Sequence, residues 1–137
     1  MVLDNILRET CVSIKQDADV LLAYQKGRAL AAEMGFSNED QMIVVIAIME
    51  VARNIVRYAG QGEVNFSAFQ QDGRHGLCVV ARDSGPGIPS IERAMEDGYS
   101  TGGGLGLGLS GAKRLMDEFE ITSRVGQGTT IQMKKWK

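Results

Sequence analysis

The length, composition and charge of this chain are those of an ordinary globular domain. Its 137 residues are 44% hydrophobic and 23% charged, with a formal net charge of -2 at pH 7, which disfavours a disordered chain and a nucleic-acid-binding tail. We expect one domain over residues 1–137. No apolar run reaches the roughly 20 residues of a membrane span, and the first ten residues lack the basic start and long apolar centre of a signal peptide. We therefore expect a cytoplasmic protein that binds neither membrane nor nucleic acid.

Apolar and turn-forming residues predict a strand and then two helices in the first half of the chain. The strand is expected at residues 11–14 and the first helix at 17–36. The second helix lies within 37–62, with Ser37 and Asn38 as N-cap candidates. Both helices are expected to end at a glycine. The middle of the second helix is apolar on almost all sides, which predicts that it is buried.

Two hairpins are predicted in the remainder of the chain. Strand-like runs at 63–71 and 76–85 flank one turn, and runs at 119–125 and 129–136 flank the sequence Gly-Gln-Gly. A Rossmann domain would show regular alternation of strands and helices, and this chain does not show it. The order predicts an α+β sandwich, in which a mixed, mostly antiparallel sheet has helices packed on one face.

The cysteines and the histidine limit the chemistry that we expect. Cys11 and Cys78 lie in apolar, strand-like contexts without CxxC spacing, so we expect two buried free thiols. His75 is the one histidine and lies in a turn-like segment. We therefore expect it on the surface, with no His-ligated metal site and no Ser-His-Asp triad.

Three polar residues interrupt the apolar second helix. Glu50, Asn54 and Arg57 follow one another at spacings of four and three residues, which places them on one helix face. Burying such groups without partners costs about 1 to 3 kcal/mol each, and more for the charges, so their presence needs a reason. One interpretation is a functional face. The alternative is an exposed charged stripe from Glu50 to Arg57, in which Asn54 is incidental.

A second polar position follows directly on a predicted strand. Asp83 lies at the strand end, and Gly85, Pro86 and Gly87 form a tight turn after it. A strand-end carboxylate beside backbone without Cβ atoms can accept from an exocyclic amine and leaves room for a flat ring. The alternative is a simple turn that Asp83 caps.

The most unusual segment is GGGLGLGLSG, residues 102–111, which directly precedes a predicted helix. Its glycines favour a phosphate-binding lid, because backbone N–H groups can turn toward phosphate oxygens and the helix N-terminus adds its positive dipole end. The spacing does not match a Walker A loop, a Rossmann fingerprint or a protein-kinase signature. A flexible linker is the alternative, which the interspersed leucines disfavour.

Together these segments resemble the ATP-binding (Bergerat, or GHKL) fold shared by Hsp90, type II topoisomerases, MutL and histidine kinases. EVARN resembles the N box, DSGPGI the G1 box, GLGLGLSGAKRLM the G2 box and GQGTTIQ the closing Gly-Thr element. From about residue 8 onward, the chain more closely resembles the RsbT-type serine/threonine switch kinases of bacterial stress-signalling complexes. The segments that carry this closer resemblance are MEDGYSTGGGLGLGLSGAKRLMDEF, ARNIVRYAGQGEV and DSGPGIP.

The resemblance implies a role for each site residue, with ATP and Mg²⁺ as cofactors. Glu50 would be the catalytic base, Asn54 the Mg²⁺ ligand, and Arg57 a phosphate or lid contact, with Tyr58 beside it. Asp83 would bind the adenine amine. The remaining nucleotide contacts would be Gly85, Gly87, Gly104, Leu105, Gly106, Leu107, Gly108, Leu109 and Thr129, with Thr130 as a second hydroxyl.

The resemblance also implies partners. Members of this family phosphorylate Ser or Thr on small STAS-domain proteins and, once free of them, activate a PP2C-type phosphatase. Two other functions stay open. One is an anti-sigma-factor kinase, and the other is a nucleotide-gated binding module without transfer activity. The carboxylate of Glu50 favours an enzyme, because a pure switch needs no base.

Overall fold

The computed structural model describes residues 5–88, 91, 95 and 108–137. Its described elements, in chain order, are β1 (Asn5–Ile14), α1 (Asp17–Glu33), α2 (Asn38–Tyr58), β2 (Gly62–Gln71), β3 (Arg74–Asp83), α4 (Gly108–Leu115), β4 (Glu118–Arg124) and β5 (Gly128–Trp136).

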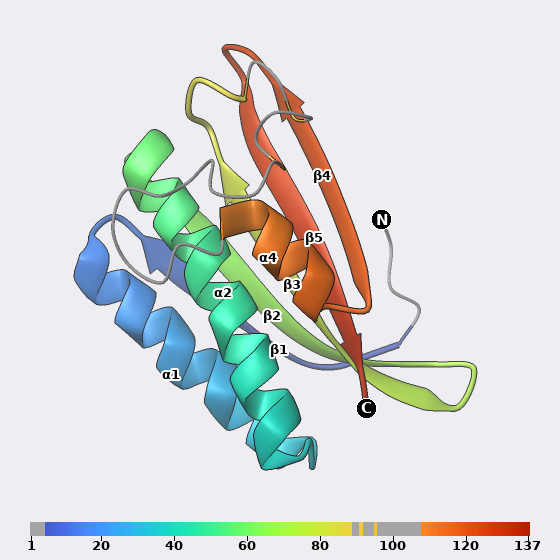
Figure 1. Ribbon diagram of the computed structural model, residues 1–137. Helices are drawn as coiled ribbons and strands as arrows, with labels where there is room; N and C mark the ends of the chain where they lie inside the picture. Colours follow the sequence, from blue (N-terminus) through green and yellow to red (C-terminus); the bar gives the residue numbers. More distant parts are fainter. Residues whose placement is uncertain (1–4, 89–90, 92–94, 96–107) are drawn as a thin grey trace.

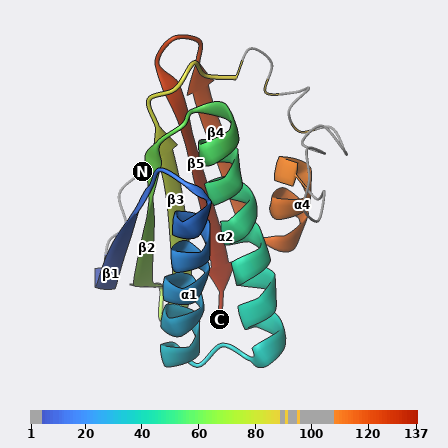
Figure 2. The same ribbon diagram turned by 90° about the vertical axis from the view of Figure 1, so that its left-hand side faces the viewer.

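The strands form one sheet in the order β1-β2-β3-β5-β4. Each pairing between described strands is antiparallel. The three described helices lie on one face of this sheet, as the two views in Figures 1 and 2 show. The predicted α+β sandwich is therefore confirmed, with a sheet that is antiparallel in all its described pairs rather than mixed.

The helix ends follow the local signals in the sequence. The Ser37 hydroxyl accepts a hydrogen bond from the backbone N–H of Asp40 at 3.1 Å, so Ser37 is the N-cap of α2. Gly35 and Gly60, which follow α1 and α2, have φ of 86° and 84°. This left-handed conformation is the common way to end a helix and favours glycine. Both predicted glycine ends are confirmed.

Both predicted hairpins are present. The two residues between β2 and β3, Asp72 and Gly73, have φ of 52° and 77°, as a type I′ turn requires. Between β4 and β5, Gly126 and Gly128 have φ of 80° and 118°. Strand β5 returns between β3 and β4, so the last strand of the chain lies inside the sheet, next to its edge strand β4.

The hydrophobic core lies between the sheet and the helices. The buried α2 side chains are Val44, Val45, Ala47, Ile48, Glu50, Val51, Ala52 and Ile55, so the predicted burial of this helix is confirmed. Phe66 of β2 and Met133 of β5 are fully buried in the same core. Helix α1 approaches α2 closely at Gly27, where a Cβ atom would meet the side chain of Ile48.

The two cysteines differ in exposure, which corrects the expectation of two buried thiols. Cys78 is buried, but Cys11 is exposed. Because Val12 and Ile14 of β1 point into the core, the alternation of the strand turns Cys11 to the open face of the sheet. There its thiol contacts a carboxylate oxygen of Glu63 at 3.6 Å.

His75 is exposed at the start of β3, as expected. Among the described helices, none combines the length and the apolar character needed to cross a membrane.

Candidate functional site

The C-terminal half of α2 forms one wall of a narrow crevice, and the start of α4 forms the other. The crevice is lined by Glu50, Arg53, Asn54, Arg57, Tyr58, Gly108 and Leu109. Figure 1 shows α4 alongside α2 over the same face of the sheet. Glu50, Asn54 and Arg57 thus share one helix face, as their spacing predicts.

Glu50 is the buried member of this face. Only 7% of the residue is exposed, which excludes the alternative of an exposed charged stripe that begins at Glu50. A buried carboxylate is costly unless it is paired. Its ion pair is with Arg53, whose Nη1 lies 3.6 Å from Oε1 of Glu50. Sequence reasoning missed Arg53, although its spacing of three residues from Glu50 is a usual ion-pair spacing on a helix.

The N-terminus of α4 faces the crevice. Gly108, the first residue of the helix, is buried and has φ of 62°, and Leu109 is 2% exposed. The first N–H groups of a helix have no intrahelical partner and carry a positive partial charge, so they suit an anion. The predicted lid residues Gly104, Leu105, Gly106 and Leu107 lie outside the described residues.

Asp83 ends β3, as predicted, and its carboxylate organises the turn that follows. Oδ1 accepts hydrogen bonds from the backbone N–H of Gly85 at 2.9 Å and from the backbone N–H of Thr129 at 3.3 Å. The turn-capping interpretation of Asp83 is therefore correct. Because both bonds go to Oδ1, turn capping is compatible with a further contact through Oδ2.

The glycines beside Asp83 are required by packing within the protein. A Cβ at Gly85 would lie 2.5 Å from the Cβ of Ala59, the residue after α2. Gly87 has φ of 80°, and a Cβ there would meet the backbone carbonyl of Arg124. The approach at Gly85 holds the turn against the C-terminal end of α2, and the approach at Gly87 holds it against the end of β4. The turn at Asp83 and the crevice at Glu50 therefore border the same helix.

Thr129 faces the helix side of the sheet, as its alternation with Ile131 predicts, and is 5% exposed. Its Oγ1 lies 2.8 Å from Oγ of Ser123 on β4, and Ser123 also accepts from the N–H of Ile88 at 2.7 Å. Thr130 points to the opposite face and lines a polar groove. Ser123 was missed, and only the register of the second hairpin, which pairs it with Thr129, could have indicated it.

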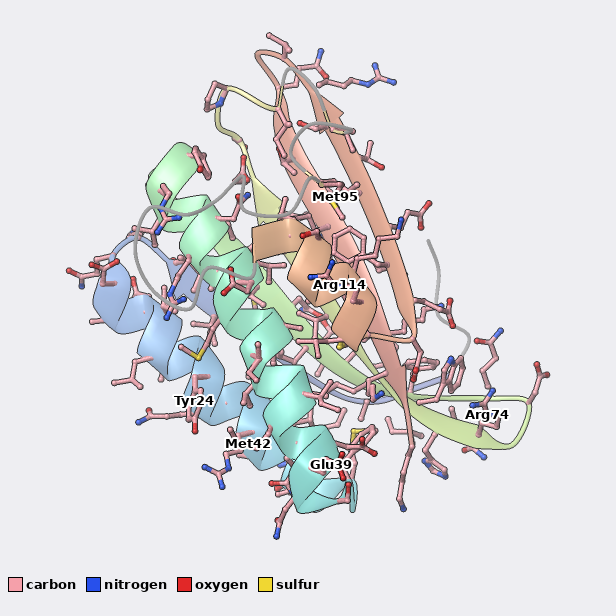
Figure 3. All side chains as sticks on the ribbon, viewed as in Figure 1. Tyr24, Glu39, Met42, Arg74, Met95 and Arg114 are labelled. Atoms are coloured by element: carbon pink, nitrogen blue, oxygen red, sulfur yellow. The ribbon has the colours of Figure 1, made fainter. Side chains whose placement is uncertain are left out.

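Figure 3 helps to locate the crevice along α2. Glu39 and Met42 mark the N-terminal end of the helix, and Arg114 lies on α4 beside the same helix further along. The α2 side chains that line the crevice come from the C-terminal half of the helix. The site thus depends on the C-terminal half of α2, the turn after β3 and the start of α4.

Comparison with known proteins identifies the family that has this arrangement. The model of the histidine kinase-like ATPase domain family matches residues 15–135. The serine/threonine-protein kinase RsbT of Bacillus subtilis (strain 168) is 50% identical over 128 residues, which cover 93% of this chain and 96% of RsbT. This chain belongs to the histidine kinase-like ATPase family, as an RsbT-type member.

More distant members agree with this assignment. The anti-sigma F factor of Geobacillus kaustophilus (strain HTA426) is 39% identical over 114 residues, which cover 78% of this chain and 77% of that protein. The solved structure of the mycobacterial sensor histidine kinase MprB superposes with a TM-score of 0.54 at 19% identity and covers 94% of this chain and 97% of MprB. At that identity the likeness shows the fold alone. The predicted resemblance and fold are both confirmed.

Proposed function

We propose that this protein is a serine/threonine protein kinase that transfers the γ-phosphoryl group of ATP to a STAS-domain partner in bacterial stress (stressosome) signalling. The observation that carries the proposal is the buried carboxylate of Glu50, one helical turn from Asn54, opposite the N-terminus of α4. The relative that is 50% identical is itself named a serine/threonine-protein kinase. A module that only bound nucleotide would have no use for a buried base.

The nucleotide would lie along the C-terminal half of α2. At one end, Asp83 would accept from the adenine amine through Oδ2, with a bridging water, because its Oδ1 already accepts from Gly85 and Thr129. At the other end, Arg57 and the first N–H groups of α4, from Gly108 onward, would contact the phosphates. The contacts predicted for residues 104–107 complete the phosphate site in this proposal.

The side chains of the crevice fit Mg²⁺ bound together with ATP. Among the described residues, no group of three or more His, Cys, Asp or Glu could hold a metal by itself. Mg²⁺ commonly keeps several waters and takes most other ligands from substrate phosphates, so one amide oxygen from Asn54 suffices as the protein ligand. When bound there, the cation would neutralise phosphate charge.

Glu50 would act on the acceptor hydroxyl. As the hydroxyl oxygen bonds to the γ-phosphorus, the bond from that phosphorus to the β–γ bridging oxygen breaks and ADP leaves. The proton of the hydroxyl passes to the Glu50 carboxylate. Leu109, which is buried at the start of α4, would help to exclude water and so favour transfer to protein over hydrolysis.

Paired variants test these two roles. Glu50→Gln should bind ATP and Mg²⁺ normally but lose about 100- to 10,000-fold in transfer, the usual contribution of a general base. Asn54→Ala should instead weaken ATP binding in the presence of Mg²⁺, measured by isothermal titration calorimetry. The control is Glu33→Gln, which removes an exposed carboxylate of α1 that pairs with Arg8. The assay measures transfer from radiolabelled ATP to a copurifying STAS-domain protein. Undiminished transfer by Glu50→Gln would refute the proposal.

Two further parts of the proposal concern partners and location. We place the protein in the cytoplasm, where the STAS-domain protein is its substrate and a PP2C-type phosphatase is a second partner when that substrate is released. The similarity to anti-sigma F factors supports a competing function as an anti-sigma-factor kinase. Copurification of a sigma factor, rather than a STAS-domain protein and a phosphatase, would favour that function.

A further inference from the structure

The buried carboxylate of Glu50 has an arginine as its neighbour on the same helix. Arg53 follows it by three residues, and its Nη1 lies 3.6 Å from Oε1 of Glu50. The two side chains differ in exposure, at 27% for Arg53 and 8% for Glu50. The pair therefore joins a desolvated carboxylate to a guanidinium that reaches the surface, and it lies in the wall of the crevice.

We propose that Arg53 is a positioning residue for phosphoryl transfer, which holds the Glu50 carboxylate by one oxygen and leaves the other for the acceptor hydroxyl. The inference rests on the proposed role of Glu50 as the base. Arg53 exchanges no proton itself, since its guanidinium stays charged. It acts on the orientation of Glu50 and on the charge around it.

The charge argument comes from the chemistry of the substrate. A triphosphate that enters the crevice brings several negative charges close to a carboxylate that is largely removed from water. In such surroundings like charges repel much more strongly than in bulk solvent. A guanidinium within ion-pair distance of the carboxylate offsets this repulsion, so Glu50 can keep its place when ATP is bound.

The place of Arg53 distinguishes it from Arg57. Both arginines line the crevice and also a larger groove between α1 and α2, whose other lining residues are Asp17, Val20, Leu21, Met49 and Val56. Arg53 is one turn from Glu50, whereas Arg57 is two turns away and nearer the end of the helix. We therefore assign to Arg53 the positioning of the Glu50 carboxylate, and to Arg57 the contact with the phosphates.

The decisive experiment is a double-mutant cycle on transfer kinetics. Arg53→Gln should lower kcat about 10- to 100-fold, which is less than or equal to the smallest contribution usual for a general base, with the KM for the STAS-domain protein unchanged. Arg53→Lys should recover part of that loss, because it keeps the charge but not the geometry of the guanidinium. If Arg53 acts through Glu50, the double variant with Glu50→Gln and Arg53→Gln should be no slower than Glu50→Gln alone.

Matched measurements separate the outcomes. Arg28→Gln removes an exposed arginine of α1 that donates to the Tyr24 hydroxyl at 3.2 Å, and it should leave kcat unchanged. Losses that multiply in the double variant, or a rise in KM for the protein substrate alone, would overturn the inference. Full activity of Arg53→Gln would overturn the inference about Arg53 but leave the role of Glu50 intact. Full activity of Glu50→Gln would overturn the proposed function itself. If Arg53→Gln fails to fold by circular dichroism, Arg53→Lys takes its place in the same cycle.

Discussion

Replacing Asp83 by asparagine separates the two functions that we assign to its carboxylate. Oδ1 holds the turn through the N–H groups of Gly85 and Thr129. Asparagine keeps an oxygen that can accept both bonds, so the turn should persist. Its NH₂ group then occupies the place of Oδ2, and a donor there cannot accept from the adenine amine. We expect Asp83→Asn to fold but to bind ATP poorly.

The size of each effect follows from the kind of bond that is lost. A hydrogen bond to a charged group contributes about 1.5 to 3 kcal/mol, which corresponds to a roughly 10- to 150-fold weaker affinity for ATP. Asp83→Ala removes that bond and also both bonds that hold the turn. Leaving two backbone donors unpaired should cost a further 1 to 3 kcal/mol or so in stability, or a fall in Tm of several degrees for a chain of this size.

Titration calorimetry with two nucleotides and a thermal melt tests this reasoning. The inosine nucleotide has a carbonyl oxygen where adenine has its amine, so the native protein should prefer ATP and Asp83→Asn should lose that preference. Its Tm should stay close to the native value, whereas Asp83→Ala should melt lower. If Asp83→Asn binds ATP as tightly as the native chain, or still discriminates against the inosine nucleotide, Asp83 does not contact the base.

Two other predictions concern the core and the cysteines. Gly27→Ala should lower the stability by about 1 to 3 kcal/mol, as overpacking does. The new methyl group meets the side chain of Ile48, which is fully buried, so that Ile48 can shift only by displacing other core side chains. A denaturant titration measures this, and an unchanged midpoint would contradict it. At pH 8, iodoacetamide should alkylate Cys11 in the folded protein and spare Cys78. Burial raises the pKa of the Cys78 thiol to about 11, so only about one thiol in a thousand is ionised at that pH, and reaction should increase as the pH rises or the chain unfolds. Equal labelling of both cysteines in a mass spectrum of the folded protein would show that the described burial of Cys78 is wrong.

The fold was predictable because its signals are local in the chain. A serine before an acidic first turn predicted the start of α2, and glycines predicted the ends of both long helices. The turn between β2 and β3 needs positive φ at both central residues, and Asp72 and Gly73 are among the residues that tolerate it. Each signal involves a few neighbouring residues, so no knowledge of the tertiary structure was needed to place these helix ends and this turn. The first strand was predicted only at residues 11–14, whereas β1 begins at Asn5.

Part of the site was predictable for the same reason. The spacing from Glu50 to Asn54 fixes a shared helix face, and Asp83 follows directly on an apolar strand. Contacts between distant segments were not predictable in this way. Ser123 meets Thr129 only through the register of β4 against β5. Cys11 is exposed because β1 lies at the edge of the sheet and the described helices cover the opposite face.

The choice between Arg53 and Arg57 shows why a helical pattern is incomplete evidence for a site. Both arginines lie within two turns of Glu50, and the sequence alone left open whether Glu50 and Arg57 belong to a functional face or to an exposed charged stripe. The structure pairs Glu50 with Arg53, so the carboxylate and its counter-charge lie one turn apart on one helix. Because both side chains leave the same backbone segment, a shift of α2 would carry them together and preserve their geometry. A base whose counter-charge came from a loop would need that loop to be ordered before each transfer, which would cost conformational entropy.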